Sequence, residues 1–435
     1  MASTPKRQMA LTLFMLSFGY HTDAWRHPES RANEIGQLTL ARDMVKAAEA
    51  AKIHAVFFAD SQDVASIRSG GNRATGLHEP ISSIGAMIGF TEKIGLLGTM
   101  STTFSEPYNV ARQFAGLDML SNGRVGWNIV TSIMGNKNYG LADMPDPEDR
   151  YRRATEFVEV VKKLWESWEA DAVIDDRESG WWADPDKIHD INHVGEFFDV
   201  QGALNMPRPP QGHPVLVQAG QSPAGIELGS SVADAIYTAQ PRKDKSLEFY
   251  ANFKRLIAEK GRNPDKVKIL PGIMPIVGRT QAEADEIADE LARYINPIHG
   301  REQLDRVLDV DTSDLDLDEK VPAERLIDGP GRHERWRTLY SPMARDLTIR
   351  QMIVELSRAS GHQWMAGTAS KIADHMIEWF DDRACDGFNL NPPHVPVGMH
   401  LMLDLLVPEL QERGYFQHDY QGDTLRERMD LEIID

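Results

Sequence analysis

The sequence is poor in cysteine. Cys385 is the single cysteine among 435 residues, so the chain can build neither an intrachain disulfide nor a cysteine-based zinc site. This usage is typical of proteins from a reducing compartment, and we expect the protein to be cytoplasmic.

Long apolar runs are also missing. No stretch approaches the roughly 20 apolar residues that a membrane-spanning helix needs. Lys6 and Arg7 precede an apolar run at 9–20 that superficially resembles a signal peptide, but no small-x-small cleavage site follows it. We therefore predict that residues 11–18 form the first core strand and that no membrane is a partner.

Positive charge is in deficit. Lys and Arg number 47 against 66 Asp and Glu, which gives a formal net charge of −19. Nucleic acids and anionic membranes both bind basic faces, so neither is expected as a main partner. The chain is 41% hydrophobic and 26% charged, as in globular proteins, and it is long enough for one barrel with insertions or for two domains.

Apolar strand-like runs alternate with amphipathic helical segments at the spacing of βα units, which predicts a parallel sheet with right-handed crossovers. The predicted strands are 11–18, 55–60, 94–103, 124–132, a run starting at 215, 235–239, 268–278 and 387–391. The predicted helices are 38–52, 80–91, 107–120, 150–168, 224–231, 244–260, 281–294, 347–357 and 369–380.

Eight strands indicate a fold of the α/β class, a TIM (β/α)8 barrel, with an open doubly wound sheet as the alternative. We expect a single domain over 1–435 with two insertions. The first, at about 169–212, is rich in Asp, Trp, Gly and Pro. The second, at about 296–346, is expected to be irregular and charged, and its run of aspartates at 309–318 is expected to be a solvated loop rather than a calcium site.

The most informative stretch is Pro-Val-Leu-Val-Gln-Ala-Gly-Gln-Ser at 214–222. Val215 begins a run typical of a strand buried on both faces. Gly220 has no Cβ to keep a ligand from the backbone. Ser222 followed by Pro223 is a strong helix-start signal. The free N–H groups of a helix start favour an anion, although the same pattern also occurs in an ordinary strand–helix turn.

Polar residues follow most predicted strands, at the end where barrel enzymes keep their active sites. They provide amides and hydroxyls with one carboxylate, and include Asp60, Thr102, Thr103, Asn128, Gly220, Gln221 and Ser222. The sequence has no P-loop and no Gly-x-Ser-x-Gly elbow. This set indicates a site that holds a polar planar ligand, although each residue alone is equally consistent with a helix cap.

Five histidines are candidate functional groups. His189 and His193 stand four residues apart, but they fall in the first insertion, so we favour a structural role and expect no metal site. His21, His27 and His362 lie near strand ends or in loops. They are candidates for proton transfer near neutral pH, with hydrogen-bonded loop histidines as the alternative.

Several short motifs occur in order along nearly the whole chain. They are Trp25 to Pro28, Ala59-Asp60-Ser61, Ser105 to Arg112, Gly123 to Ser132, Asp149-Arg150-Tyr151, Ile191-Asn192-His193 with Gly195, Pro207 to Gly220, Gly387 to Asn389 and Val407 to Leu410. The set resembles the two-component, flavin-dependent monooxygenases of the bacterial-luciferase-like superfamily. It is most similar to the branch of nitrilotriacetate monooxygenase component A, long-chain alkane monooxygenase and dibenzothiophene-sulfone monooxygenase.

The resemblance implies a luciferase-like TIM barrel, in a homodimer or homotetramer, that binds FMN as FMNH2. A separate NAD(P)H:flavin reductase would supply the reduced flavin, which would react with O2 to a C4a-peroxyflavin that oxygenates a small organic substrate. The protein would orient the substrate and keep water out. The candidate apolar walls are Trp25, Phe57, Phe104, Trp127 and Trp364, with a place in the core as the equal alternative for each.

The resemblance also implies roles for single residues. Asp60 and either Thr102 or Thr103 would contact the isoalloxazine side, and Asn128 would lie near the ring. Tyr151 and Ser222 would bind the phosphate, with Gly220 and Gln221 in the same turn. One position departs from the pattern, because Pro147 stands four residues before Tyr151, where relatives often have a histidine.

Three other classes of protein are alternatives to a monooxygenase. A deazaflavin (F420)-dependent oxidoreductase of the same superfamily would transfer hydride without O2. A non-catalytic flavin-binding protein would bind flavin without accelerating any oxidation. A metal-dependent barrel hydrolase is disfavoured, because the predicted strand ends lack clusters of histidine and carboxylate.

Overall fold

Eight parallel strands close into a barrel in the computed structural model, which describes residues 7–34, 36–64, 79–329 and 336–434. In chain order the strands are β1 (Ala10–Met15), β2 (Ala55–Phe58), β3 (Gly95–Ser101), β4 (Val125–Val130), β9 (Val215–Gln218), β10 (Ala235–Thr238), β11 (Lys268–Gly278) and β13 (Gly387–Leu390). Closure comes from the pairing of β10 with β11, of β11 with β13 and of β13 with β1. The TIM barrel is confirmed, and the open sheet is excluded.

A ninth parallel strand, β12 (Gln363–Thr368), was missed. β11 is 11 residues long, and only its first part belongs to the barrel. Its second part continues beyond the mouth and pairs with β12, from Ile273 opposite Gln363 to Gly278 opposite Thr368. The β12 sequence has few residues with high strand propensity, so its conformation depends on a partner about 90 positions earlier in the chain.

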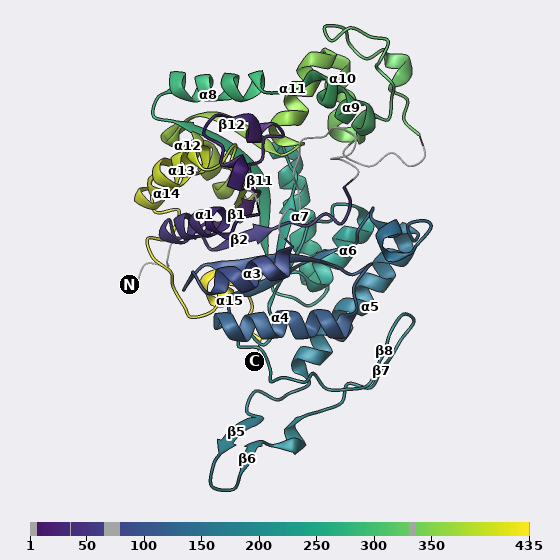
Figure 1. Cartoon of the computed structure of the whole chain (residues 1–435), viewed down its shortest axis with the longest axis vertical. Helices are drawn as coiled ribbons and strands as arrows, with labels where there is room; N and C mark the ends of the chain where they lie inside the picture. The colour runs from purple at the N-terminus through teal and green to yellow at the C-terminus, as the bar shows by residue number, and fades with distance from the viewer. Residues whose placement is uncertain (1–6, 35, 65–78, 330–335, 435) are drawn as a thin grey trace.

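Helices cover the outside of the barrel (Figure 1). They are α1 (Leu38–Ala50), α3 (Pro80–Ile88), α4 (Pro107–Ser121), α5 (Pro147–Glu166), α6 (Pro223–Val232), α7 (Lys243–Glu259) and α12 (Ala369–Asp381), whereas α8 (Gln281–Arg293) packs on the outer part of β11 and on β12. Between the helices and the barrel wall lies the main core, which includes Phe114, Trp127 and Phe157. One predicted boundary is wrong: α5 begins at Pro147 rather than at 150, because Asp146 caps it by accepting the N–H of Glu148.

Inside the barrel, an apolar layer formed by residues such as Phe57, Leu97 and Tyr237 is closed from below by the C-terminal segment. Its helices α13 (Val397–Leu401) and α14 (Val407–Glu412) pack in the core outside the barrel, whereas Leu425 of α15 (Leu425–Arg428), Met429 and Leu431 pack into the interior layer. The amino end of the described barrel is thus filled by apolar side chains.

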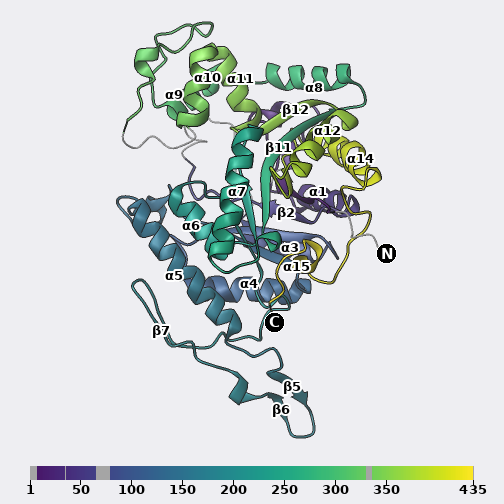
Figure 2. The ribbon, with the colours of Figure 1, turned by 180° about the vertical axis from the view of Figure 1, so that it is seen from behind.

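The segment between α5 and β9 carries two small antiparallel sheets, β5 (Val173–Asp176) with β6 (Trp181–Ala183) and β7 (His193–Val194) with β8 (Asp199–Val200). They project away from the barrel in both views (Figures 1 and 2). The described helices offer no span long and apolar enough to cross a membrane.

The prediction of an irregular segment at 296–346 is wrong. It contains α9 (Pro297–Leu308), a π-helical turn (Trp336–Tyr340) and α10 (Ser341–Asp346), which pack with α11 (Ile349–Ala359) around a separate apolar cluster. Many charged side chains between the apolar positions concealed this core. The acidic loop at 309–318 packs on this cluster through Val310, Leu315 and Leu317, while its Asp314 pairs with Arg325 and its Asp318 pairs with Arg350.

Candidate functional site

The turn between β9 and α6 has the predicted local structure. Ser222 caps α6, because its Oγ accepts the N–H of Gly225 at 3.1 Å. A Cβ on Gly220 would lie 2.3 Å from Nε2 of Gln218 and 2.9 Å from Cα of Gly225, so only glycine lets the chain turn this tightly against the helix start. The free N–H groups of α6 therefore open at the carboxyl mouth of the barrel.

Two residues predicted to bind phosphate are brought together at this helix start. Tyr151 lies in the first turns of α5, and the Oγ of Ser222 donates to its Oη at 3.2 Å. Ser222 is exposed and Tyr151 is half-buried. The two hydroxyls and the start of α6 form one cluster of donors facing solvent, and such a cluster favours a negatively charged group.

Polar side chains also line the barrel interior. The Thr12 hydroxyl donates to Oδ1 of Asn389 at 2.8 Å, and Nδ2 of Asn389 donates to Oδ1 of Asn391 at 3.2 Å. Across the barrel, Nδ2 of Asn128 donates to the Thr99 hydroxyl at 2.9 Å. Alternation along the strands turns these side chains inward and their apolar neighbours toward the helices.

Several buried atoms of this mouth have no hydrogen-bond partner among the residues that the structure describes. Three of them are Oδ1 of Asn128, Nδ2 of Asn391 and the hydroxyl oxygen of Thr103. Leaving such a group unsatisfied costs about 1–3 kcal/mol, so each calls for an explanation. A polar ligand seated on the mouth would supply partners to all three.

Thr102 and Thr103 differ in what their hydroxyls do. The fully buried Thr102 hydroxyl donates to the Val130 carbonyl at 3.1 Å, and its N–H donates to the same oxygen. The N–H of Thr103 donates to Oγ of Ser101, whereas its hydroxyl oxygen is buried without a hydrogen-bond partner among the described residues. Thr102 thus holds β3 to β4, and Thr103 is the residue of the two that can contact a ligand.

Asp60 follows β2 at the rim of the mouth. It is half-buried, and burial raises the pKa of its carboxyl, although Nε2 of Gln62 donates to it at 3.3 Å. Tyr139, from the loop after β4, was missed by the sequence analysis. Burial and the Asp60 charge raise the pKa of its hydroxyl, and its ring stacks on Phe104 with centroids 4.3 Å apart. The pair forms an aromatic wall beside Asp60.

His21 follows β1 and is 2% exposed. Its Nδ1 accepts the N–H of Asp23 at 3.3 Å. Burial, followed by the charge of Arg358 and the proximity of His394, lowers the pKa of His21 to about 3. The imidazole is therefore neutral at physiological pH, which excludes it as a cationic general acid.

His27 and His394 stack on each other, with ring centroids 4.4 Å apart. Burial lowers the pKa of His394 to about 3, with a smaller contribution from His27. His394 was missed, although its position four residues after β13 places it at a strand end. His362 stands directly before β12 and contacts the edge of Tyr20, with centroids 5.5 Å apart.

The predicted apolar walls occupy different places. Phe57 packs inside the barrel against Phe14 and Tyr237, and Trp364 lies on β12 above the mouth. Trp127 is fully buried between the barrel and its helices, where Nε1 donates to the Met100 carbonyl. Trp127 is thus a core residue, which is the alternative that the sequence left open for it.

The two histidines of the first insertion contact two different glutamate side chains. Nε2 of His193 lies 3.2 Å from Oε1 of Glu156, and Nε2 of His189 lies 2.8 Å from Oε1 of Glu169. These contacts fit the structural role that the sequence favoured.

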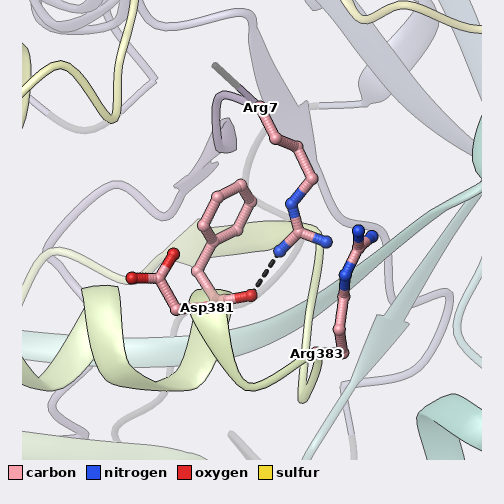
Figure 3. A pocket seen from close by; sticks show the side chains of 4 residues that line it. Arg7, Asp381 and Arg383 are labelled. Atoms are coloured by element: carbon pink, nitrogen blue, oxygen red, sulfur yellow. Dashed lines mark hydrogen bonds between the residues drawn. The ribbon is translucent and has the colours of Figure 1, made fainter.

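A surface hollow lies at the other end of the barrel, lined by Arg7, Phe380, Asp381 and Arg383 (Figure 3). Arg7 precedes β1 and Asp381 ends α12, so the hollow belongs to the amino end. The polar groups of the mouth do not line it.

Comparison with known proteins places the chain in a family. The family model described as luciferase-like monooxygenase matches residues 14–383. N-acetyl-S-(2-succino)cysteine monooxygenase of Bacillus subtilis (strain 168) is 41% identical over 99% of this chain and 98% of its own length. Nitrilotriacetate monooxygenase component A of Aminobacter aminovorans is 38% identical over 98% and 97%.

A solved structure of riboflavin lyase with modified FMN and riboflavin superimposes with a TM-score of 0.85. It is 29% identical, and the match covers 98% of this chain and 97% of that one. Together with the closed barrel and the polar mouth, these matches extend over nearly the whole molecule. The chain therefore belongs to the luciferase-like monooxygenase family.

Proposed function

We propose that this protein is the oxygenase component of a two-component system that uses reduced FMN and O2 to oxygenate a small organic substrate. The observation that carries the proposal is the hydroxyl pair of Tyr151 and Ser222 at the start of α6. This pair lies at the same barrel mouth as the unpartnered polar atoms of Thr103, Asn128 and Asn391.

The residues of the mouth fit the parts of a flavin. The start of α6, with the Ser222 and Tyr151 hydroxyls, would hold the phosphate, because N–H and O–H donors converge there. Asn128 and Thr103 would bond the polar edge of the ring system. Gly220 would keep this helix start in place, since a side chain there would meet Gln218 and Gly225.

When bound, reduced FMN supplies the electrons that allow one atom of O2 to enter the substrate. The protein itself would hold the substrate in position and exclude water from the site. Phe104 and Tyr139 form a wall beside Asp60, and the apolar layer around Phe57 and Tyr237 closes the barrel below. Exclusion of water strengthens the polar contacts of the mouth and suppresses side reactions.

The proposed partner is a separate NAD(P)H:flavin reductase, in keeping with the relative named as component A of its monooxygenase. The donors of the phosphate site support this, because Ser222 is exposed and a flavin could enter and leave from solvent. The proposed substrates include carboxylate-bearing molecules such as those in the names of the two relatives.

The test is an isotope experiment. The protein is mixed with chemically reduced FMN, ¹⁸O2 and a panel that contains N-acetyl-S-(2-succino)cysteine and nitrilotriacetate. We expect one ¹⁸O atom in the product or in the aldehyde or keto acid that it releases, read by mass spectrometry under conditions that limit exchange with water. Product formation without O2 would favour hydride transfer, and flavin binding without any product from a broad panel would favour a storage protein.

A further inference from the structure

The loop after β1 is fixed between two other elements above the barrel mouth. The N–H of Thr22 donates to the Ser357 carbonyl near the end of α11 at 3.1 Å, and the N–H of His21 donates to the Pro393 carbonyl after β13 at 3.1 Å. The residue that follows Ser357 is Arg358. The backbone thus holds His21 and Arg358 in one neighbourhood.

Arg358 stands near the end of α11, with one side-chain carboxylate and one aromatic ring beside its guanidinium. Its side chain is 16% exposed, and its guanidinium lies over the Trp364 ring, 4.3 Å from the centroid. Its hydrogen bond runs from Nη1 to Oε1 of Glu355 at 3.3 Å, and Glu355 also accepts Nε1 of Trp364 at 3.0 Å. The Arg358 Nε is buried and has no partner within the described parts of the chain.

His21 presents a second donor. Because its Nδ1 accepts the N–H of Asp23, the proton of the neutral ring sits on Nε2. That Nε2 is buried and has no partner among the described residues. Nε2 of His21 and Nε of Arg358 are therefore two buried donors without an acceptor among the described residues, which is costly unless a ligand supplies one.

The barrel topology separates this pair from the proposed phosphate site. In the ring of eight strands, β9 is the fifth and β1 is the first, so α6 and the loop after β1 stand on opposite sides of the mouth. A flavin whose phosphate sits at α6 would extend its ring toward the centre. His21 and Arg358 thus lie on the side of the mouth away from the start of α6.

We propose that Arg358 and His21 form a subsite for a carboxylate group of the substrate. Arg358 would bind the carboxylate through two parallel N–H groups, with Trp364 holding the guanidinium plane, and His21 would donate from Nε2. The assignment rests on the proposed function, since the bound molecule is the one to be oxygenated. It names the substrate class as small molecules with at least one carboxylate.

The test is a binding measurement that does not depend on turnover. Nitrilotriacetate, N-acetyl-S-(2-succino)cysteine and their methyl esters are titrated calorimetrically into the protein, with and without oxidised FMN. We expect at least one acid to bind and its ester to bind at least tenfold more weakly. Arg358→Gln is expected to weaken the acid about tenfold or more and to leave the ester unchanged, and Arg358→Lys to have an intermediate effect.

Arg350→Gln is the matched control, because Arg350 lies on the same helix but pairs with Asp318 at the surface. Melting curves of all variants verify that they are folded. The proposal is overturned if neither acid binds, or if Arg358→Gln and Arg350→Gln bind the acid equally. Failure of the proposed oxygenase function would appear instead as absent ¹⁸O incorporation, which is read independently of these affinities.

Discussion

Ser222 combines two roles that substitutions can separate. Its Oγ caps α6, and the same hydroxyl would donate to the flavin phosphate. Ser222→Ala removes both: loss of an N-cap costs about 1 kcal/mol of folding stability. Loss of a hydrogen bond to a charged group costs about 1.5–3 kcal/mol of binding. Because Ser222 is exposed, we expect the lower end, an FMN dissociation constant about tenfold higher.

Ser222→Asp distinguishes the two roles. Aspartate caps a helix as well as serine does, so the stability is expected to stay near wild type. Its carboxylate, however, would face the phosphate. Two unit charges 4 Å apart repel by about 1 kcal/mol in water, and a phosphate carries nearly two charges, so we expect FMN to bind a further ~30-fold more weakly than to Ser222→Ala.

The assay is anaerobic titration with FMN and with riboflavin, followed by flavin fluorescence, alongside urea unfolding of each variant. Riboflavin has no phosphate, so its affinity is expected to be the same for wild type and Ser222→Asp. Ser222→Thr is the control that keeps both the cap and the hydroxyl. Equal weakening of FMN and riboflavin by Ser222→Asp would refute the assignment of this helix start to the phosphate.

Three further predictions concern packing and pH. Gly220→Ala places a methyl group against two atoms closer than 3 Å, so we expect a loss of about 1–3 kcal/mol in urea unfolding and weaker FMN binding, with Gly202→Ala, which has open space, as the neutral control. Arg426→Ala leaves the buried Asp234 without its 2.7 Å partner. A longer ion pair to that carboxylate remains, so we expect a loss of about 3 kcal/mol in the same assay, and a loss below 1 kcal/mol would contradict this. Burial lowers the pKa of His54 to about 4, so below its unfolded pKa of about 6.5 the unfolded chain takes up the proton first. The contribution of His54 to stability is then expected to fall by about 1.4 kcal/mol per pH unit down to pH 4, so His54→Gln should reduce the total slope by about that amount when unfolding is repeated from pH 7 to 4.5.

Where the signals were local, the sequence was sufficient to predict the structure. The turn at 214–222 was predicted together with its cap and its buried strand, because a cap joins residues only three apart and an apolar run identifies a strand without reference to its partner. The same holds for the eight barrel strands. β12 and the helices of 296–346 were missed, since both depend on distant partners, the outer half of β11 and the apolar face of α11.

The sequence by itself thus determined the barrel, its helix starts and the chemical types of the strand-end residues. Which of these residues contact one another became visible in the tertiary structure. There Tyr151 contacts Ser222, and the Thr102 hydroxyl donates to a backbone carbonyl. Trp127 is buried in the core, and His394 and Arg358 lie near His21. The physical reason is barrel closure. Closure brings together strand ends that lie hundreds of residues apart in the sequence. Burial at the closed mouth, rather than residue type, then determines which polar atoms are hydrogen-bonded, which groups are charged and which atoms remain for a ligand.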